Sequence, residues 1–482
     1  MTALLTLWLT ASPGPGLDPD SMSYLGAAAS VAHGDGLRVP IAPWHAADST
    51  IHLKAFPPGY SLVLAVPIRL GVEPELAGRL VQAVASAVTV TIVSALVMEL
   101  TGPVAALLIA LLLILTPALI EDNLSILSEP LYLMLVVIFL LALVRRGESP
   151  LLYGTIAALG VMTRYLGGSL AAAAVLWSLL QGTSRRDRLV RALKASVPTL
   201  IVLALWVFDA HGGPGRPPAS SLAADFHLGD ALEELRDALL YWLGPNAESV
   251  GASVGLAIGA GLVGLWLFGR AIRHLEWERW RTDVLPALWL ASGSIVLCHL
   301  GVLLFSRIFI GHQIPFDGRL LSAVILIAEL LFVVTVAGFW STWRWPARLI
   351  VLGLLLVWVN GAVAWGRERA SDAHANGWDY NGLDFQQSPT VAWARGATGR
   401  TLFTNHPVPL WFHAGRVSRD LPQSLAPDTV AAFVQALDRR HGAVIMFADT
   451  SWQPGVPIDS LVAAAGLRVV ARFEDGVVFE LR

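Results

Sequence analysis

The first three quarters of the chain alternate long apolar segments with short polar ones. The apolar segments occupy residues 1–11, 58–70, 79–99, 103–120, 131–144, 150–164, 166–181, 195–209, 250–268, 284–305, 320–340 and 347–365. A helix that crosses a bilayer needs about 20 apolar residues, and several of these segments approach or exceed that length. The pattern therefore predicts an all-α polytopic membrane domain over residues 1–365.

The pattern changes after residue 365. Residues 366–482 mix charged residues, proline, glycine and short apolar runs, as a soluble domain does. Two short apolar runs predict buried strands, an amphipathic run predicts a helix, and two further runs around Asp475-Gly476 predict a β-hairpin. These elements cover residues 401–403 and 443–447, then 427–440, and finally 469–473 with 477–481. We therefore predict a small C-terminal α/β domain.

Composition supports a membrane protein. The 482 residues are 55% hydrophobic and 14% charged, with a mean hydropathy of +0.62, whereas soluble domains carry about 25% charged residues. The net charge of −3 argues against nucleic acid as a partner. The single cysteine, Cys298, excludes a disulfide framework and a cysteine-based metal site. Segment 1–11 is short for a span, and we interpret it as a shortened first transmembrane helix.

Basic residues predict the orientation of the helices. They gather in the loops around residues 145–146, 185–194, 270–281 and 344–348. Because basic loops stay on the cytoplasmic side, we place these four inside the cell. The segments 150–164 and 166–181 then form a helical hairpin with its tip outside, and loop 12–57, loop 210–249, loop 306–319 and the C-terminal domain also lie outside. Two alternatives stay open for segment 58–70: it is a half-span, or the turn at 69–79 that follows it does not reach the inner face.

The external loop 12–57 contains three candidate site residues. Asp20 lies near the start of a predicted helix, with Asp20 or Ser21 as the N-cap, and Tyr24 follows one turn later on the same face. Lys54 precedes a Pro-Pro pair at the entry to the next apolar segment, where its ammonium group is placed to meet a lipid phosphate. The simpler interpretations are an N-cap for Asp20 and, for Lys54, a side chain that extends from the interface to water.

Two further loops and the hairpin tip bring charged residues to the same side. Glu129 opens an apolar segment, Arg164 lies at the hairpin tip, and Asp317 and Arg319 precede a late apolar segment. A carboxylate at the mouth of a membrane helix is costly to desolvate, and an arginine there needs an anionic partner such as a lipid phosphate or Glu129. There are simpler interpretations. Glu129 would complement the helix dipole, Arg164 would extend its side chain from the membrane interface to water, and Asp317 would pair with Arg319. Together these charges indicate a site for an anionic lipid-linked substrate at the outer leaflet.

The order and sidedness of these motifs resemble the superfamily C glycosyltransferases. The bacterial branch of that superfamily includes lipid A aminoarabinose transferases and protein O-mannosyltransferases. The matching motifs, in chain order, are Asp20 with Tyr24, Lys54 with Pro57-Pro58-Gly59-Tyr60, Glu129-Pro130-Leu131-Tyr132, Arg164-Tyr165-Leu166-Gly167, and Asp317 with Arg319. The resemblance covers about residues 1–365, and it implies a polyprenyl-phosphate sugar as donor, a lipid, glycan or protein as acceptor, and transfer that inverts the anomeric centre at the outer face of the cytoplasmic membrane.

The resemblance also implies roles for the candidate residues. Asp20 would act as general base on the acceptor hydroxyl, and Glu129 would position the acceptor or bind a metal. Lys54 and Arg164 would hold the departing lipid phosphate, with Arg319 a weaker candidate for that role. A metal held by Asp20 and Glu129 would be Mg or Mn, because both ligands are oxygens. The chain departs from the pattern in its short first helix, in Ser21 where relatives have a second acid, and in Glu rather than Asp at 129.

Two other classes of function remain compatible with the residues. A transporter or flippase of lipid-linked sugars would place polar residues at the membrane midplane and often shows internal repeats, whereas here the charges lie at one rim and no repeat is evident. A polymerase or ligase of surface polysaccharide would share the membrane, the sidedness and the lipid phosphate. A homologue without catalytic activity, with a binding or scaffold role, is a further alternative.

Overall fold

The computed structural model describes residues 1–146, 149–210, 228–243, 283–310, 314–448 and 456–482, together with Gly269 and Arg281. The predicted apolar segment 250–268, most of loop 210–249 and most of the basic loop 270–281 lie outside the described residues. The chain forms two compact units. The helical unit comprises residues 1–9, 54–60 and 79–371, and the α/β unit comprises residues 10–53, 61–78 and 372–482.

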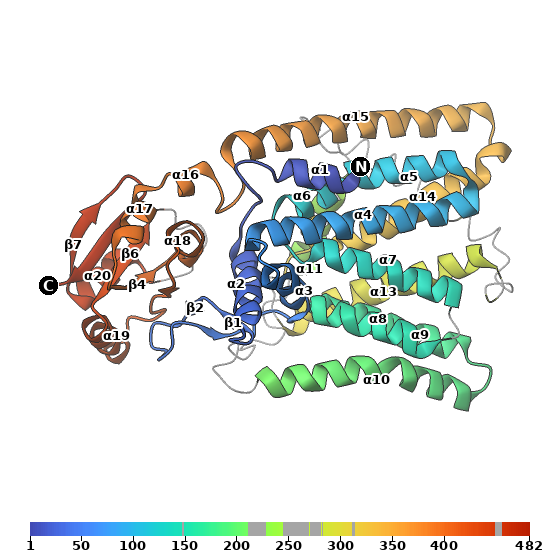
Figure 1. The fold of residues 1–482 in the computed structure, drawn as a ribbon. Helices are drawn as coiled ribbons and strands as arrows, with labels where there is room; N and C mark the ends of the chain where they lie inside the picture. Colours follow the sequence, from blue (N-terminus) through green and yellow to red (C-terminus); the bar gives the residue numbers. More distant parts are fainter. Residues whose placement is uncertain are drawn as a thin grey trace. The chain divides into compact units, whose positions relative to one another are not determined.

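The helical unit is a bundle of apolar helices (Figure 1). Its described helices are α1 (Thr2–Leu9), α4 (Pro74–Thr101, from residue 79 onward), α5 (Pro103–Leu115), α6 (Pro117–Leu124), α7 (Glu129–Arg146), α8 (Pro150–Thr163), α9 (Gly168–Gln181), α10 (Arg185–Ala210), α11 (Leu228–Leu243), α13 (Val284–Phe309), α14 (Gly318–Phe339) and α15 (Trp345–Asn376). Among the described residues, five helices are long and apolar enough to cross a membrane: α4, α10, α13, α14 and α15. The predicted polytopic helical domain is confirmed.

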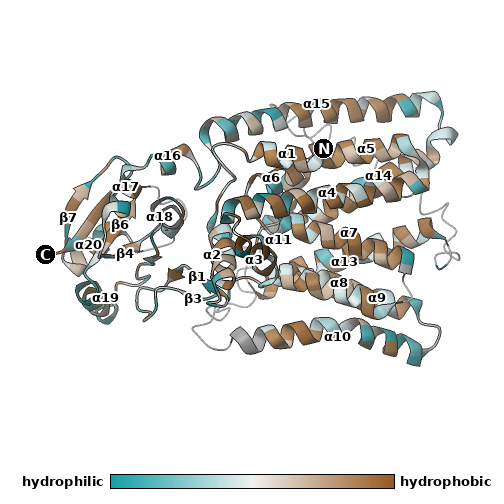
Figure 2. Cartoon of the chain, in the orientation of Figure 1, coloured by the Kyte–Doolittle hydropathy of each residue, from teal (hydrophilic) through white to brown (hydrophobic). Residues whose placement is uncertain are grey.

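The apolar stretches that could cross a membrane differ in how much the rest of the protein buries them. In α14, 67% of this stretch is buried, whereas in α10 and α15 17% of it is buried. The core packs residues of α7, α9, α13 and α14 together, including Phe139, Trp177, Leu288 and Leu326. Figure 2 shows apolar residues along the middle of α10 and of α15. Apolar side chains that no helix covers suit contact with lipid.

One predicted span is broken. Residues 103–120 form α5 and α6, which meet at 54°. Pro117 begins the second helix and Thr116 adopts extended backbone at the break. The Thr116 hydroxyl donates to Glu329 at 2.5 Å, which ties the break to α14. The bend brings the polar residues of α6 toward the start of α7.

The predicted hairpin of 150–164 and 166–181 is present as α8 and α9. The two helices are antiparallel, since Tyr153 bonds Ser178 at 2.6 Å near the open end, while a Cβ on Gly160 would lie 2.9 Å from Leu170 near the tip. A Cβ on Gly167 would lie 2.2 Å from the Gly160 backbone, so the tip requires glycine. Each helix has 14 residues, which is about 21 Å and shorter than a bilayer core.

Charged residues lie at both ends of the helical unit. α7 begins at Glu129, and the hairpin tip Arg164 contacts Glu129. The open end of the hairpin therefore lies at the same end of the unit as the last residues of α7. That end is 18 residues, or about 27 Å, from Glu129. Arg281 donates to the Leu180 carbonyl at that far end (3.1 Å), and the basic stretch 185–191 begins α10 there. Figure 2 shows this hydrophilic end of α10. The sequence assigned these two ends to opposite sides of the membrane.

The α/β unit contains a six-stranded sheet (Figure 1). Its strand order is β2-β5-β4-β6-β8-β7. The first four strands are parallel to one another, whereas β8 is antiparallel to both of its neighbours, β6 and β7. The strands are β2 (Ile41–Ala42), β4 (Thr401–Thr404), β5 (Ser418–Arg419), β6 (Gly442–Phe447), β7 (Leu467–Arg472) and β8 (Gly476–Leu481). The predicted strands at 401–403 and 443–447 and the predicted hairpin are confirmed as β4, β6 and β7–β8.

The α/β unit also contains helices, two of which come from the N-terminal part of the chain. They are α2 (Pro19–His33), α3 (Gly59–Arg69, from residue 61 onward), α16 (Leu383–Gln386), α17 (Pro389–Gly396), α18 (Pro407–Ala414), α19 (Pro427–Arg439) and α20 (Ile458–Ala465), and a separate two-stranded ribbon pairs β1 (Arg38–Val39) with β3 (Ile51–His52). The helix predicted at 427–440 is α19, and Phe433 and Leu437 pack on the sheet. Segment 58–70, left open above, forms α3, which is 11 residues long and shorter than a span.

The first loop and the C-terminal segment form one unit. Strand β2 comes from residues 41–42, yet it is the edge strand of the C-terminal sheet. The sequence-based division placed loop 12–57 with the membrane domain and began the soluble domain at residue 366, whereas the contacts group residues 10–53 with 372–482. A two-residue strand has no periodicity that a sequence reading can detect, so this pairing only appears in the folded chain.

Candidate functional site

Glu129 is the centre of a buried ionic cluster in the helical unit. It is the first residue of α7, and its side chain is 1% exposed. The same carboxylate oxygen, Oε1, contacts the guanidinium groups of Arg164 and Arg319. Arg164 follows the last residue of α8 in an extended conformation, and Arg319 lies in the first turn of α14. The predicted partnership of Arg164 with Glu129 is present, and Arg319 joins it.

Asp317 fixes the start of α14. It is the N-cap, and its carboxylate accepts a bond from the Leu320 backbone N–H at 2.8 Å. Burial raises the pKa of Asp317, while the Leu320 N–H and the neighbouring Arg319 act in the opposite direction. Because the cap sets where the helix begins, it also sets the direction of Arg319 toward Glu129. The simpler interpretation of an Asp317–Arg319 pair is replaced by a cap and an Arg319–Glu129 pair.

A second interaction holds the segment before α14. Glu234 of α11 binds Arg307 of α13, with Nη2 donating to Oε1 at 3.0 Å, and its other oxygen accepts from the Phe316 N–H at 2.9 Å. Arg307 is 5% exposed and also donates to the Ile314 carbonyl at 3.1 Å. The sequence reading assigned no role to Glu234 or Arg307. Their sequence separation is large, and no local pattern connects them.

Asp122 is a site residue that the sequence reading did not select. It lies on α6, is 1% exposed, and its Oδ2 has no hydrogen-bond partner among the described residues. Its carboxyl group interacts electrostatically with Glu129, Arg164 and Arg319. Gln82 of α4 donates to the Asp122 carbonyl at 3.2 Å and so holds this part of α6. The available signal was the acidic run at 121–122 shortly before Glu129.

A row of neutral polar groups connects the helices next to the cluster. The Tyr132 hydroxyl on α7 lies 3.1 Å from Ser169 Oγ on α9, and Ser169 Oγ lies 3.5 Å from His299 Nδ1 on α13. His299 Nε2 lies 2.8 Å from the Leu320 carbonyl on α14 and must donate to it. His299 Nδ1 is therefore the acceptor for Ser169. This row joins four helices one turn inward from the ionic cluster.

Lys54 has a buried ammonium group. Its Nζ is inaccessible to solvent and has no hydrogen-bond partner among the described residues. The Lys54 carbonyl accepts a bond from the Tyr165 hydroxyl at 3.2 Å, and Tyr165 follows Arg164 in the hairpin tip. A Cβ on Gly59 would lie 2.6 Å from the Met162 carbonyl, so the chain after Lys54 packs closely on the end of α8. A buried ammonium without a partner is unfavourable, and an anion would remove that penalty.

Asp20 and Tyr24 lie in the α/β unit, in α2. The N-cap of α2 is Asp18, which accepts from the Ser21 N–H at 2.7 Å, while Ser21 Oγ accepts from the Asp18 N–H at 3.1 Å. The prediction of Asp20 or Ser21 as the cap is wrong, because Pro19 at the first helical position starts the helix earlier. The simplest alternative for Asp20, an N-cap role alone, is thereby removed. Asp20 is half-buried and Tyr24 is buried, one turn further on.

The residues around Glu129 do not resemble a metal site. Among the described residues, no group of three or more His, Cys, Asp or Glu side chains could hold a metal ion. The contacts of Glu129 are two guanidinium groups, which repel a cation. A divalent metal held by Asp20 and Glu129 stays a prediction.

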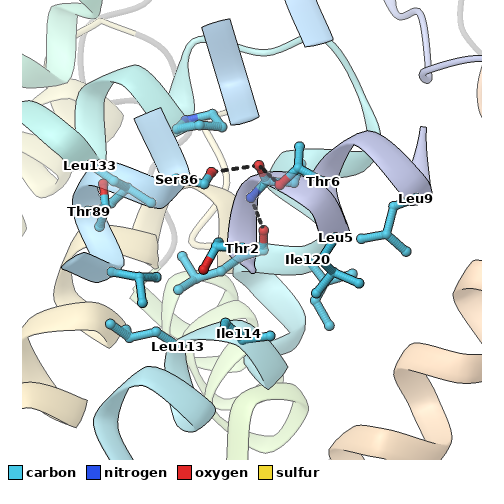
Figure 3. A pocket seen from close by; sticks show the side chains of 14 residues that line it. Thr2, Leu5, Thr6, Leu9, Ser86, Thr89, Leu113, Ile114, Ile120 and Leu133 are labelled. Carbon is cyan, nitrogen blue, oxygen red and sulfur yellow. Dashed lines mark hydrogen bonds between the residues drawn. The ribbon is translucent and has the colours of Figure 1, made fainter. Parts of the chain in front are cut away.

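A pocket with a volume of about 40 Å³, lined mainly by apolar side chains, lies among α1, α4, α5, α6 and α7 (Figure 3). Its lining starts at Pro130, the residue after Glu129, and continues over Leu133, Leu113 and residues of α1 such as Leu5. Asn123 is its most polar lining residue. Asn123 Oδ1 accepts from Ser86 at 2.7 Å and from Thr6 at 3.3 Å, and its Nδ2 donates to the Leu119 carbonyl at 2.6 Å. These bonds pair the polar groups of Asn123 within the helical unit.

Comparison with known proteins agrees with this architecture. Residues 55–211 match the family model of dolichyl-phosphate-mannose-protein mannosyltransferases. No curated protein matches the chain in sequence. The structure of ArnT from Cupriavidus metallidurans bound to undecaprenyl phosphate matches 99% of this chain and 96% of its own, with a TM-score of 0.58 and 15% identity. The chain has the superfamily C glycosyltransferase fold.

Two other proteins of this fold are similar over most of the chain. AglB, an archaeal oligosaccharyltransferase from Archaeoglobus fulgidus solved with an inhibitory peptide and a dolichol-phosphate, has a TM-score of 0.52 and 11% identity, and the match covers 92% of this chain and 68% of AglB. The arabinofuranosyltransferase AftD from Mycobacteria has a TM-score of 0.51 and 15% identity, with 99% of this chain and 41% of AftD covered. The resemblance predicted from the motifs is confirmed at the level of the fold. The segment matched by the family model contains Glu129 and Arg164.

Proposed function

We propose that this chain is a multi-pass membrane glycosyltransferase that moves a sugar from a polyprenyl-phosphate donor to an acceptor at the outer face of the cytoplasmic membrane. The observation that supports it most is the unpaired, buried Lys54 ammonium next to the hairpin tip that carries Arg164. An ammonium group without a partner, in a fold that binds undecaprenyl phosphate in ArnT, favours a lipid phosphate as the missing anion.

The reaction follows from the chemistry of such a donor. The acceptor oxygen forms a bond to the anomeric carbon, and the Asp20 carboxylate takes the acceptor proton. The bond from the anomeric carbon to the phosphate oxygen breaks, and the electron pair leaves with the polyprenyl phosphate. Lys54 and Arg164 offset the charge that grows on this leaving group. Attack opposite the leaving group inverts the anomeric centre.

The other residues of the cluster complete the site. Glu129 holds Arg164 and Arg319 in one orientation, and this places two guanidinium groups at the side of the phosphate. Asp122, with an unbonded buried oxygen, is placed to accept a hydrogen bond from a sugar or acceptor hydroxyl. Tyr24 and Asp317 support Asp20 and Arg319 rather than react.

The orientation is part of the proposal. The ionic cluster and the basic residues at the start of α10 lie at opposite ends of the helices. If basic loops remain in the cytoplasm, the cluster opens to the outer leaflet. A cysteine introduced at Val469, which is 47% exposed on β7, should react with an impermeant thiol reagent in intact cells. Protection of that cysteine in intact cells, with labelling after lysis, would reverse the orientation.

The function is tested with the full-length chain in lipid nanodiscs. The measured product is free polyprenyl phosphate, which is released whichever sugar moves, from a panel of polyprenyl-phosphate hexoses, pentoses and amino sugars with an envelope extract as acceptor. We expect release by the unaltered chain and a loss of at least about 10²-fold in Asp20→Asn, because the amide cannot take a proton. Binding of undecaprenyl phosphate should persist in that variant. Near-normal release by Asp20→Asn would eliminate Asp20 as the base, and movement of the intact donor across the membrane without release would indicate a flippase.

A further inference from the structure

The first loop is attached to the C-terminal segment on both sides of α2. After α2, strand β2 pairs in parallel with β5, with Ile41 opposite Ser418 and Ala42 opposite Arg419. The Trp44 N–H donates to Asp420 at 2.6 Å. The Trp44 ring meets the Phe433 ring edge-on, with their centroids 5.7 Å apart.

Arg419 holds the turn that follows β2. Its side chain is buried, and its two terminal nitrogens donate to four carbonyl oxygens of the first loop. Nη1 donates to Pro43 at 3.2 Å and to Ala46 at 2.7 Å, and Nη2 donates to Ala47 at 3.3 Å and to Asp48 at 2.9 Å. Arg440 adds a bond to the Ala46 carbonyl at 2.6 Å. A planar guanidinium that binds four carbonyls in one turn fixes the shape of that turn.

The chain before α2 is attached independently. The Tyr380 N–H donates to the Leu17 carbonyl at 3.0 Å, and Asn381 Nδ2 donates to the Pro15 carbonyl at 2.9 Å. Leu17 is fully buried. These bonds lie immediately before Asp18, the N-cap of α2. The first turn of α2 is therefore anchored through its own cap.

The attached turn is coupled to α2 by close packing. A Cβ on Gly26 would lie 2.3 Å from Pro40 Cδ, so α2 touches the residue that precedes β2 without any intervening side chain. α18 also packs against α2. A shift of β2 and its turn would therefore move α2 as a body, and Asp20 lies less than two turns from Gly26.

We infer that the C-terminal segment positions Asp20 for catalysis, and that Arg419 is the positioning residue through which it holds the first loop. This inference rests on the proposed function, because it assigns a role in the transfer step. Arg419 touches no reacting atom in this account. It acts by fixing residues 43–48, and through Pro40 it fixes the direction of α2.

The chain offers a matched control for Arg419. Arg416 also binds backbone carbonyls, from Nη1 to Ala397 and from Nη2 to Arg400, each at 2.7 Å, but all its partners belong to the C-terminal segment. Arg419→Met and Arg416→Met remove the same guanidinium from the same fold. Only the first releases the loop that carries Asp20.

The test compares kcat, KM and hydrogen exchange in the two variants of the full-length chain. We expect Arg419→Met to lower kcat for release of polyprenyl phosphate by about 10- to 100-fold, since misplacement of a catalytic group by about 1 Å has an effect of this order. KM for the donor and the binding of undecaprenyl phosphate should stay within about twofold of the parent, because the Lys54 side of the site is not altered. Hydrogen exchange should accelerate in residues 15–48 in Arg419→Met and not in Arg416→Met.

Each outcome decides the inference. Equal kcat in Arg419→Met and the parent would overturn the positioning role while leaving the proposed function intact, whereas no release by the parent would overturn the proposed function and this role with it. Equal losses in both variants would assign Arg419 to domain stability alone. Should Arg419→Met fail to fold, Gly26→Ala displaces α2 from Pro40 by a different route and should reduce kcat with unchanged lipid binding. Normal kcat in that variant would overturn the coupling.

Discussion

The two units of this protein use arginine in opposite ways. In the helical unit, Arg164 and Arg319 share one carboxylate oxygen of Glu129. In the α/β unit, Arg419 makes its bonds to neutral backbone carbonyls and none of those bonds is to a carboxylate. The first arrangement lies near charged groups that are buried without a partner among the described residues, and the second fixes a turn of the chain.

This difference distinguishes the candidate site from a structural contact. Both terminal nitrogens of Arg419 donate to backbone carbonyls, although the neighbouring Ser418 Oγ is buried without a hydrogen-bond partner among the described residues. Near Arg164, the atoms that lack such a partner belong to charged side chains, Lys54 Nζ and Asp122 Oδ2. Native proteins pair almost all buried polar groups, so orphans gathered in one region point to a ligand. The same amino acid thus indicates function in one unit and stability in the other.

The largest expected effect comes from breaking the ionic cluster. Glu129→Ala leaves two guanidinium groups without their carboxylate in an apolar setting, and we expect a loss of about 3 kcal/mol in unfolding free energy, because an uncompensated buried charge is strongly unfavourable. We take the lower end of the usual range since Arg319 is 32% exposed and reaches water. Thermal and denaturant unfolding in detergent measure this loss.

The control for Glu129→Ala is Glu99→Ala. Glu99 pairs with Arg145, and both side chains are more than 40% exposed. Such pairs contribute about 0–1 kcal/mol. Similar destabilisation by the two substitutions would show that burial does not distinguish the cluster from an ordinary surface pair.

A smaller effect is expected at Lys54, on the binding of lipid phosphate rather than on stability. Lys54→Met removes an unpaired buried ammonium and keeps the length of the side chain, so the fold should not lose stability. Affinity for undecaprenyl phosphate should fall about 10-fold or more, since a hydrogen bond to a charged group contributes about 1.5–3 kcal/mol. Binding is measured by titration in detergent micelles. Lys194→Met, an exposed lysine on α10, is the control, and equal affinity in the two variants would contradict a phosphate contact by Lys54.

The smallest effect concerns pH and the anchor of the first loop. Burial lowers the pKa of His413, which bonds the Tyr380 carbonyl at 2.7 Å, and Arg395 acts in the same direction. A histidine whose folded pKa is depressed contributes stability above its unfolded pKa, and this is lost as the pH falls. Between about pH 7 and pH 5 the unfolding free energy should therefore fall by less than about 1 kcal/mol from this group. His413→Gln should flatten that part of the profile, and an unchanged profile would remove His413 as its source.

Part of the site was predictable because its signals are local. An acid before Pro130 at a helix start and an arginine at a hairpin tip are visible in the sequence, and both residues meet in the cluster. Asp122 was overlooked because one acid in a short acidic run has no distinguishing pattern. The cap of α2 was misassigned by two residues because Pro19 extends the helix toward the N-terminus. Helix ends depend on single side-chain bonds and are the least predictable part of an element.

The sequence by itself determined that the chain is a polytopic membrane protein with a C-terminal α/β segment, because the length of an apolar segment follows from bilayer thickness and needs no tertiary information. It also determined which charged residues belong to one end of the helices. Only the tertiary structure decided that Arg319 shares Glu129 with Arg164, that Lys54 Nζ is buried and unpaired, and that residues 41–48 join the C-terminal sheet. The pairings link residues from 190 to nearly 400 positions apart in the chain, and pairing at that distance follows from packing rather than from local pattern.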